Sequence, residues 1–382
     1  MDYKQIKYAL LMIFDYKVDE RSLSPNLFVE HKPTSLLSMF TDLKSIYDLS
    51  KNTFKIPEEN ITIITDINPS DNEKYPWIMK QNNKNVNLIK LKYPDIEIIT
   101  KAMAQFIENT IRGIKETIVY KGENIKHQIL FYLSGHGSMF NSHETALIFM
   151  RRKENVLQRC YLHRDEIFNI LFGKLHVNNN GLMKIKCYNR NVDINSLKWN
   201  FEEDSFYVKL LPINSKRNSY EINRGIPLDT EMLVLIDTCH SSTITNFPYI
   251  YDGKTMIKRT DIKNKYPICI SIGASQDISN APSTIRGSPF TESICTIFKN
   301  LKYSVSIKTF YNILYSTIPQ ILEESKPTIT STIDDPNQQI PFLDSFEKEE
   351  DEEIILKNIN KIPKSFNKYF PSSLPSTPIY NS

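Results

Sequence analysis

The chain alternates short apolar runs with longer amphipathic stretches. The apolar runs have few polar residues between them, which is typical of strands that are buried on both faces of a sheet. Five such runs are Tyr8–Phe14, Ile61–Ile64, Ile129–Leu133, Met232–Ile236 and Ile268–Ile272. Strands that alternate with helices predict an α/β fold with a mainly parallel central sheet of about six strands, flanked by helices.

Three stretches between or after the runs follow the i, i+3, i+4, i+7 spacing of an amphipathic helix. They cover residues 36–47, 99–114 and 307–321, and Pro319 disturbs the last of them. Because Pro33 precedes the first stretch, we expect Thr34 or Ser35 to cap that helix.

Two segments depart from this rhythm. Residues 173–226 are rich in Asn, Lys and Arg, and two possible strands at 182–188 and 206–211 indicate an inserted β-rich segment, as a hairpin beside the main sheet. The C-terminal residues 347–382 contain the runs EKEEDEE and PSSLPSTP, whose compositions resist packing. We therefore expect one domain over residues 1–346, followed by a disordered tail.

Composition narrows the class of protein. The 382 residues carry a formal net charge of +3 without a basic block, which argues against nucleic acid as a partner. The run Tyr8–Phe14 is too short to span a bilayer, and no run elsewhere approaches the required length, so no membrane partner is expected. Five cysteines without a secretion signal favour a reducing compartment. We expect a cytoplasmic monomer.

Two of the predicted strands end in residues that can carry chemistry. One run leads into the sequence SGHG at 134–137, and another leads into DTCH at 237–240. Ligands of open parallel sheets bind beyond the carboxyl ends of the strands, so neighbouring strands would bring His136 and Cys239 together. An imidazole beside a thiol can take its proton and create a nucleophilic thiolate. The pattern predicts a Cys–His site.

Other roles for these residues stay open. Cys239 after an apolar run is compatible with core packing, and a single histidine is often structural. Cys160 and His163 have the spacing of half a zinc site, but no second half follows, so no metal ligand is predicted. His240 adjoins Cys239, but adjacent residues at a strand end point to opposite sides, which favours His136 as the base.

The two motifs resemble the catalytic signatures of metacaspases, which are cysteine peptidases of the caspase-like fold. In the second motif, Thr238 and Ser242 stand where the family usually has Ser and Gly. Residues 60–66, 272–277 and 327–332 are also similar to flanking parts of the family. The resemblance covers roughly residues 5–346 apart from the insertion, and it implies a caspase-like fold.

The resemblance implies a mechanism. Cys239 would attack the scissile carbonyl, while His136 would activate the thiol or protonate the leaving amine. The backbone N–H groups of Gly137 and Cys239 would form an oxyanion hole. Water would then release the acyl group.

The resemblance also implies protein or peptide substrates that are cut after arginine or lysine. Asp237 and Ser134 match a carboxylate and a hydroxyl of the family's acidic pocket. Asp42 matches a second carboxylate, and Met39 stands where the family has a cysteine. Two partly desolvated carboxylates attract a guanidinium and reject an acidic side chain.

Many metacaspases need calcium, but the acidic residues for it are depleted here. Asn246 stands where the family usually has Asp, Arg164 replaces an acid beside Asp165 and Glu166, and Glu144 alone remains of an acidic loop. A hard cation needs several oxygen ligands. We expect no cofactor and at most weak calcium dependence.

Family members often cut themselves in the loop after the nucleophile strand, which implies self-cleavage at Lys258 or Arg259. The predicted function is a cysteine endopeptidase. A legumain-like peptidase or transamidase is a second possibility that the sequence DTCH disfavours. A caspase-like binding or regulatory module with little activity is the third, and the insertion 173–226 and Met39 favour it.

Overall fold

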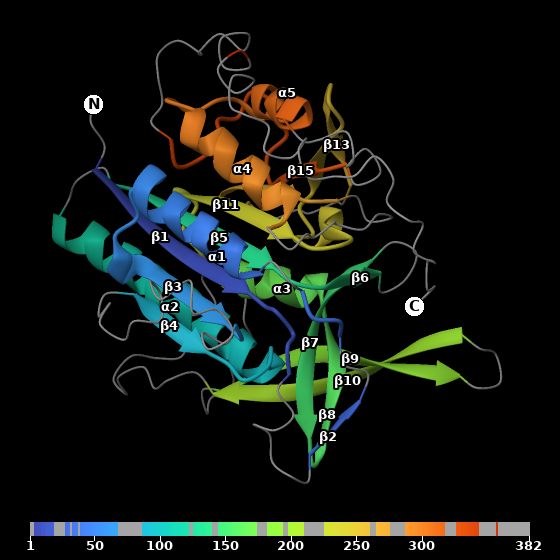
Figure 1. The fold of residues 1–382 in the computed structure, drawn as a ribbon. Coiled ribbons are helices and arrows are strands. Elements are labelled where there is room, and N and C mark those ends of the chain that lie inside the picture. Colours follow the sequence, from blue (N-terminus) through green and yellow to red (C-terminus); the bar gives the residue numbers. More distant parts are fainter. Residues whose placement is uncertain are drawn as a thin grey trace.

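The protein is built around a large twisted sheet, seen near its centre in Figure 1. The computed structural model describes residues 4–18, 27–30, 33–36, 39–67, 86–121, 125–139, 144–173, 182–193, 198–209, 225–259, 265–275, 287–317, 326–343 and 357. Six neighbouring strands run parallel. In spatial order they are β14 (Ile268–Gly273), β11 (Thr230–Asp237), β5 (Ile125–Ser134), β1 (Lys4–Ile13), β3 (Ile61–Thr65) and β4 (Asn87–Lys90).

Three short antiparallel strands extend this sheet beyond β14. They are β15 (Thr328–Ser331), β12 (Tyr249–Tyr251) and β13 (Met256–Lys258). The α/β class is confirmed, but the expected sheet of about six mainly parallel strands is wrong, because the sheet has nine strands of mixed direction in the described residues. The added strands have three or four residues, too few to give a periodic signal in the sequence.

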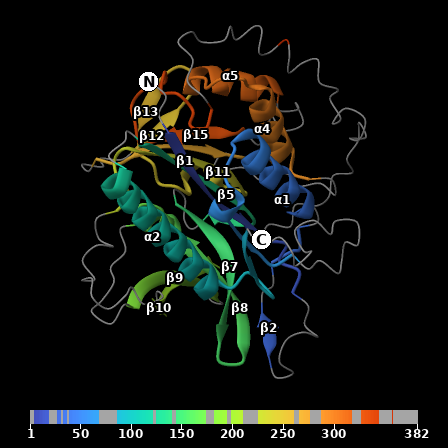
Figure 2. The same cartoon turned by 90° about the vertical axis from the view of Figure 1, so that its left-hand side faces the viewer.

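Helices cover both faces of the sheet, as Figure 2 shows. On one face lie α1 (Met39–Asp48), α4 (Pro289–Asn300) and α5 (Ile307–Thr317), together with the short helical turns η2 (Leu49–Thr53) and η3 (Glu58–Asn60). On the other lie α2 (Ile96–Lys121) and α3 (Arg164–Leu171). Alternate side chains of β5 enter the two cores, which is why its sequence reads as a continuous apolar run.

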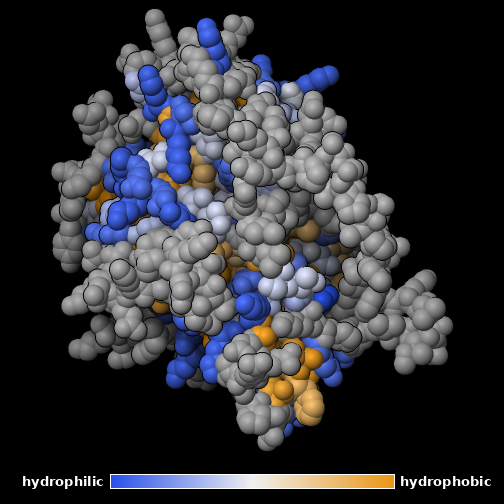
Figure 3. All heavy atoms as spheres, in the orientation of Figure 1, coloured by the Kyte–Doolittle hydropathy of each residue, from blue (hydrophilic) through white to orange (hydrophobic). Residues whose placement is uncertain are grey.

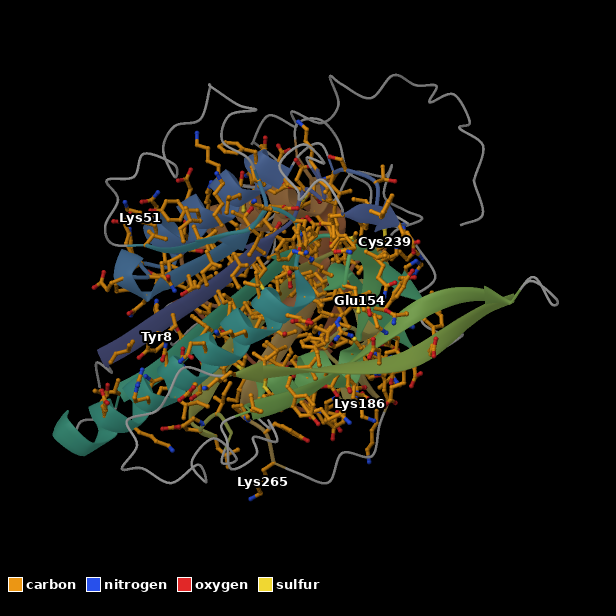
Figure 4. The ribbon with its side chains drawn as sticks, turned by 90° about the horizontal axis from the view of Figure 1, so that it is seen from below. Tyr8, Lys51, Glu154, Lys186, Cys239 and Lys265 are labelled. Atoms are coloured by element: carbon orange, nitrogen blue, oxygen red, sulfur yellow. The ribbon has the colours of Figure 1, made fainter. Side chains whose placement is uncertain are left out.

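A second sheet stands beside the first. Its order is β10 (Lys198–Lys209), β9 (Leu182–Asp193), β8 (Val156–His163), β7 (Thr145–Lys153) and β6 (Gly137–Met139), and β2 (Phe28–Glu30) pairs with β8. The β9–β10 hairpin occupies the inserted segment, and its far end projects from the body of the molecule (Figures 1 and 4). In Figure 3 apolar residues gather at the lower end of this sheet, where Figure 1 labels β2 and β8. Phe28 of β2 is 71% exposed.

The helix limits differ from those predicted. The capping role expected for Thr34 and Ser35 is wrong, because α1 begins only at Met39. The third predicted helix, α5, ends at Thr317, before Pro319, which lies outside the described residues. No helix within the described ranges is long and apolar enough to cross a membrane. The boundary of a domain over 1–346 stays a prediction, and the tail lies outside the description apart from residue 357.

Candidate active site

Two adjacent parallel strands carry the candidate dyad. The register of β5 and β11 pairs Ser134 with Asp237, and the Gly135 N–H donates to the Asp237 carbonyl at 3.3 Å. His136 and Cys239 each follow that pair by two residues. Figure 4 places Cys239 at the end of the molecule toward which the parallel strands run. The two motifs therefore lie side by side at one rim of the sheet.

Gly137 lies directly against the nucleophile turn. A Cβ atom added to Gly137 would lie 2.0 Å from the carbonyl oxygen of Cys239 and 3.0 Å from the Thr238 hydroxyl. Only a residue without a side chain permits this approach. The glycine after His136 is therefore required by the contact between the two motifs.

We predict that Gly137→Ala lowers both stability and any activity of the site. The new methyl must push apart two backbone segments, which costs about 1–3 kcal/mol in overpacked sites. Gly113→Ala on α2 is the control, since its Cβ meets only the tip of the Tyr8 side chain at 2.9 Å. Melting temperatures of the two variants give the comparison, and an unchanged Gly137→Ala protein would contradict the packing described here.

The direction of the Gly137 N–H follows from the pairing of β6 with β7. The Ile148 N–H donates to the His136 carbonyl at 3.0 Å, and β6 and β7 are antiparallel with Gly137 opposite Leu147. Successive residues of an antiparallel strand direct their polar backbone groups to opposite sides. The N–H of Gly137 therefore points away from β7 and is not used in that ladder.

The imidazole of His136 is fixed by the segment before α1. Its Nε2 atom lies 2.6 Å from the carbonyl oxygen of Thr34. A carbonyl only accepts hydrogen bonds, so Nε2 carries the proton and Nδ1 is the basic nitrogen. Burial lowers the pKa of His136, while the bond to Thr34 opposes this change. The ring is thus mostly neutral near pH 7 and able to accept a proton. No pattern in the sequence indicates this role of Thr34.

The chain turns sharply after Cys239. His240 adopts the left-handed conformation, with φ 55° and ψ 38°, and leads into η6 (Ser241–Thr243). The Ser241 hydroxyl accepts from the Ser275 N–H at 2.9 Å, which ties the turn to the end of β14. Cys239 is half-buried, whereas the other four cysteines are buried, so Cys239 is the thiol best placed to react.

The four residues expected in a substrate pocket converge beside the dyad. The Ser134 hydroxyl donates to Met39 Sδ at 3.2 Å, and Asp42 lies one helical turn after Met39 on α1. Burial and the charges of both Asp237 and Asp42 raise the pKa of Tyr132, so the two aspartates lie near the same buried phenol. Their exposures are only 5% and 2%.

Both aspartates are held by the start of α4. The Ser288 N–H donates to Asp42 Oδ1 at 2.9 Å, and the Thr291 hydroxyl donates to Asp237 Oδ2 at 2.5 Å. Burial raises the pKa of Asp237 to about 6, although the Ser288 and Thr291 hydroxyls lower it. Asp237 is therefore a carboxyl group that changes charge near physiological pH.

Neighbouring protein side chains contact the acidic groups considered for calcium. Glu144 lies 3.5 Å from Arg164 and 3.6 Å from His163, and Asp165 lies 3.5 Å from the other ring nitrogen of His163. Asp165 also accepts from Asn246 at 2.8 Å. The contact with His163 lowers the pKa of Asp165. In the described residues no cluster of three metal-ligating side chains occurs.

The zinc alternative fails on geometry. Cys160 and His163 are three residues apart on β8, so their side chains point to opposite faces of the strand. Cys160 is buried in the core against Cys187, and His163 contacts Glu144 and Asp165.

The residues considered for self-cleavage lie away from the dyad. Lys258 is exposed at the end of the edge strand β13 and pairs with Tyr249, and the Arg259 N–H donates to the Pro248 carbonyl at 2.7 Å. Strands β12, β15 and β14 separate β13 from β11. The structure does not bring these residues to Cys239.

Comparisons with known proteins give a limited likeness. No family model matches the chain. A stretch of 144 residues is 27% identical to the protein named Metacaspase-1 of Lodderomyces elongisporus, covering 35% of this chain and 28% of that relative. The chain therefore spans less than a third of the length of that relative. A crystal structure of protein GSU0716 from Geobacter sulfurreducens is 12% identical, with a TM-score of 0.45 over 89% of this chain and all of the other. A similarity of that degree supports no inference.

Proposed function

We propose that this protein is a cysteine endopeptidase in which His136 and Cys239 form the catalytic dyad. The observation that carries the proposal is the register of β5 and β11, which sets the two residues at equivalent places beyond neighbouring strand ends. The close approach of Gly137 to Cys239 supports it. The partial similarity to a metacaspase points to the same class of enzyme.

The reaction uses groups of the chain alone. Nδ1 of His136 takes the proton of the Cys239 thiol, and Sγ attacks the scissile carbonyl carbon. The oxygen that becomes negative accepts bonds from the N–H groups of Gly137 and Cys239. The imidazolium then protonates the leaving amine as the C–N bond breaks. Water adds to the thioester, which releases a carboxylic acid and restores the thiol.

The proposed substrates carry arginine or lysine before the cleaved bond. Asp42 and Asp237 supply two negative charges among buried neighbours, where a guanidinium or ammonium group is favoured over an acid. Ser134 offers a hydroxyl beside them, and Met39 limits the space. Because a methionine sulfur is no anion, the charge selection rests on the aspartates.

A binding or regulatory module is the second candidate. It is favoured by the hydrogen bonds that already engage Asp42 and Asp237, because a substrate cation would have to compete with Ser288 and Thr291. Such a module would bind basic peptides without cutting them. The intact His136 and Cys239 favour the enzyme, since a binding module has no use for a paired base and thiol.

A panel of fluorogenic peptides separates the two candidates. Peptides ending in Arg, Lys, Leu or Asp before the fluorophore are incubated with the wild type and with Cys239→Ala. Release from Arg and Lys peptides by the wild type alone supports the enzyme. Peptide binding by both proteins in fluorescence anisotropy, with no release from any peptide, supports the binding module and overturns the proposal.

We predict that cleavage does not require calcium. Glu144 already lies beside Arg164, and Asp165 already accepts a hydrogen bond from Asn246, so a divalent cation would have to displace these protein groups. The rate with an Arg peptide should change less than about twofold between buffer with chelator and buffer with about 1 mM calcium. At about 1 mM, even weak extracellular calcium sites are occupied. Strong stimulation at micromolar calcium would contradict this prediction.

We also propose self-cleavage after Lys258 or Arg259. Lys258 is exposed and basic, and β13 is an edge strand of only three residues that can detach at low cost. Because the site lies away from Cys239, one molecule would cut another. Wild-type fragments should form faster at higher protein concentration and be absent from Cys239→Ala. Equal fragments in both proteins would assign the cut to another protease.

A further inference from the structure

Tyr16 has a strained backbone directly behind the candidate dyad. It follows β1, its side chain is 1% exposed, and its φ is 59°. A bulky residue with positive φ is strained and persists only where its surroundings impose that conformation. The surroundings of Tyr16 therefore hold it in place.

Asp66 imposes that conformation. It follows β3, whose register with β1 sets Thr65 beside Ile13. Its Oδ1 accepts the Asp15 N–H at 2.7 Å, and its Oδ2 accepts the Tyr16 N–H at 2.9 Å. Asp66 is only 5% exposed, and burying a carboxyl group is costly unless it is hydrogen-bonded. The hydrogen bonds from the N–H groups of Asp15 and Tyr16 offset this cost of burial.

The Tyr16 side chain contacts both the backbone and the ring of His136. Its hydroxyl accepts the His136 N–H at 3.1 Å and donates to the Ile148 carbonyl at 2.6 Å. The Tyr16 and His136 ring centroids are 4.6 Å apart. At Gly135 an added Cβ would lie 2.9 Å from the Tyr16 hydroxyl, which explains the glycine before the histidine.

Asp15 holds the chain segment that contacts the imidazole of His136. The Leu36 N–H donates to the Asp15 carbonyl at 2.9 Å, and the Ser35 hydroxyl donates to Asp15 Oδ1 at 2.7 Å. These bonds hold the segment in which the Thr34 carbonyl contacts His136 Nε2. The ring contacts with Thr34 and with Tyr16 thus both depend on Asp15 and Tyr16, whose N–H groups bond to Asp66.

We propose that Tyr16, held in its left-handed conformation by Asp66, is a positioning residue that sets the orientation of His136 toward Cys239. The inference rests on the proposed function. Tyr16 is buried behind the imidazole and is separate from the Asp42–Asp237 pocket. Its loss should therefore impair proton transfer and leave the recognition of the basic side chain intact.

The test uses Tyr16→Phe, which removes only the hydroxyl, and Asp66→Asn, which keeps the size but replaces one acceptor with a donor. Tyr251→Phe is the matched control, because Tyr251 is 2% exposed and packs against Tyr311 on the far side of the sheet. For each protein, kcat and KM are measured with an Arg peptide. The rate of Cys239 alkylation by iodoacetamide is followed against pH by mass spectrometry.

We expect kcat to fall about 10- to 100-fold in Tyr16→Phe and Asp66→Asn, as for a misplaced catalytic group, with KM within about twofold. Their alkylation profiles should shift toward that of His136→Ala, while Tyr251→Phe follows the wild type. Profiles of Tyr16→Phe and Asp66→Asn that match the wild type would overturn the positioning role. A wild-type profile identical to that of His136→Ala would instead overturn the dyad itself, so the two failures are distinguishable. Melting temperatures show whether any loss reflects unfolding.

Discussion

Replacing Cys239 or His136 with alanine is expected to lower the cleavage of arginyl peptides by at least about a thousandfold. In the proposed mechanism each residue takes part in the covalent step, and removing one member of a catalytic unit usually costs nearly as much as removing all of it. The two losses should not add in the double variant. Since Cys239 and His136 are only partly buried, the melting temperature should stay within about 3 °C of the wild type.

His240→Asn is the matched control for the histidine. His240 adjoins Cys239 and has φ 55°, and asparagine is one of the few residues that tolerates this conformation. We expect this variant to keep activity within a few-fold of the wild type. If His240→Asn is inactive and His136→Ala is active, the base has been assigned to the wrong residue.

Asp237→Asn is expected to lower kcat/KM for Arg and Lys peptides by about one to two orders of magnitude. A hydrogen bond to a charged group contributes about 1.5–3 kcal/mol, and the variant loses the charge but keeps the shape. Cleavage of a Leu peptide should change little, so the preference for basic residues falls. Asp229→Asn, at the opposite end of β11 and exposed, is the control. Equal losses for Arg and Leu peptides would contradict a role in charge recognition.

The raised pKa of Asp237 adds a pH dependence. A carboxyl group is neutral below its pKa, so below about pH 6 the pocket loses one charge and KM for Arg peptides should rise. Stability follows the opposite direction. The unfolded carboxyl has an ordinary pKa near 4, so between about pH 4 and 6 the folded state binds more protons and loses stability as pH rises. Asp237→Asn should remove both effects.

The sequence was most informative where burial and periodicity coincide. The long central strands β1, β5 and β11 appear as uninterrupted apolar runs because both of their faces are covered. Hydrophobic periodicity does not predict strands β12, β13 and β15, because three or four residues are too few to show an alternation of apolar and polar positions. The hairpin in the inserted segment was recognised, although β9 extends to Asp193, beyond the predicted end at 188, and β10 already begins at Lys198, before the predicted start at 206.

The residues of the site also differ in whether the sequence could predict their roles. His136 and Cys239 could be paired from the sequence because each follows an apolar strand directly. Tyr16, Asp66 and Thr34 could not, because their roles arise from contacts over long sequence separations, between loops without a pattern. For Thr34 the sequence pattern instead predicts a helix cap, because a threonine after a proline is typical of that position.

The dyad can be tested most directly with a peptidyl-arginine chloromethyl ketone, which alkylates a thiolate after an arginine has been accepted beside it. Mass spectrometry of the digested protein identifies the modified cysteine. We predict one adduct, on Cys239, which is lost or greatly slowed in His136→Ala and in Asp237→Asn. An unmodified Cys239, or a rate of labelling that does not depend on His136, would contradict the account.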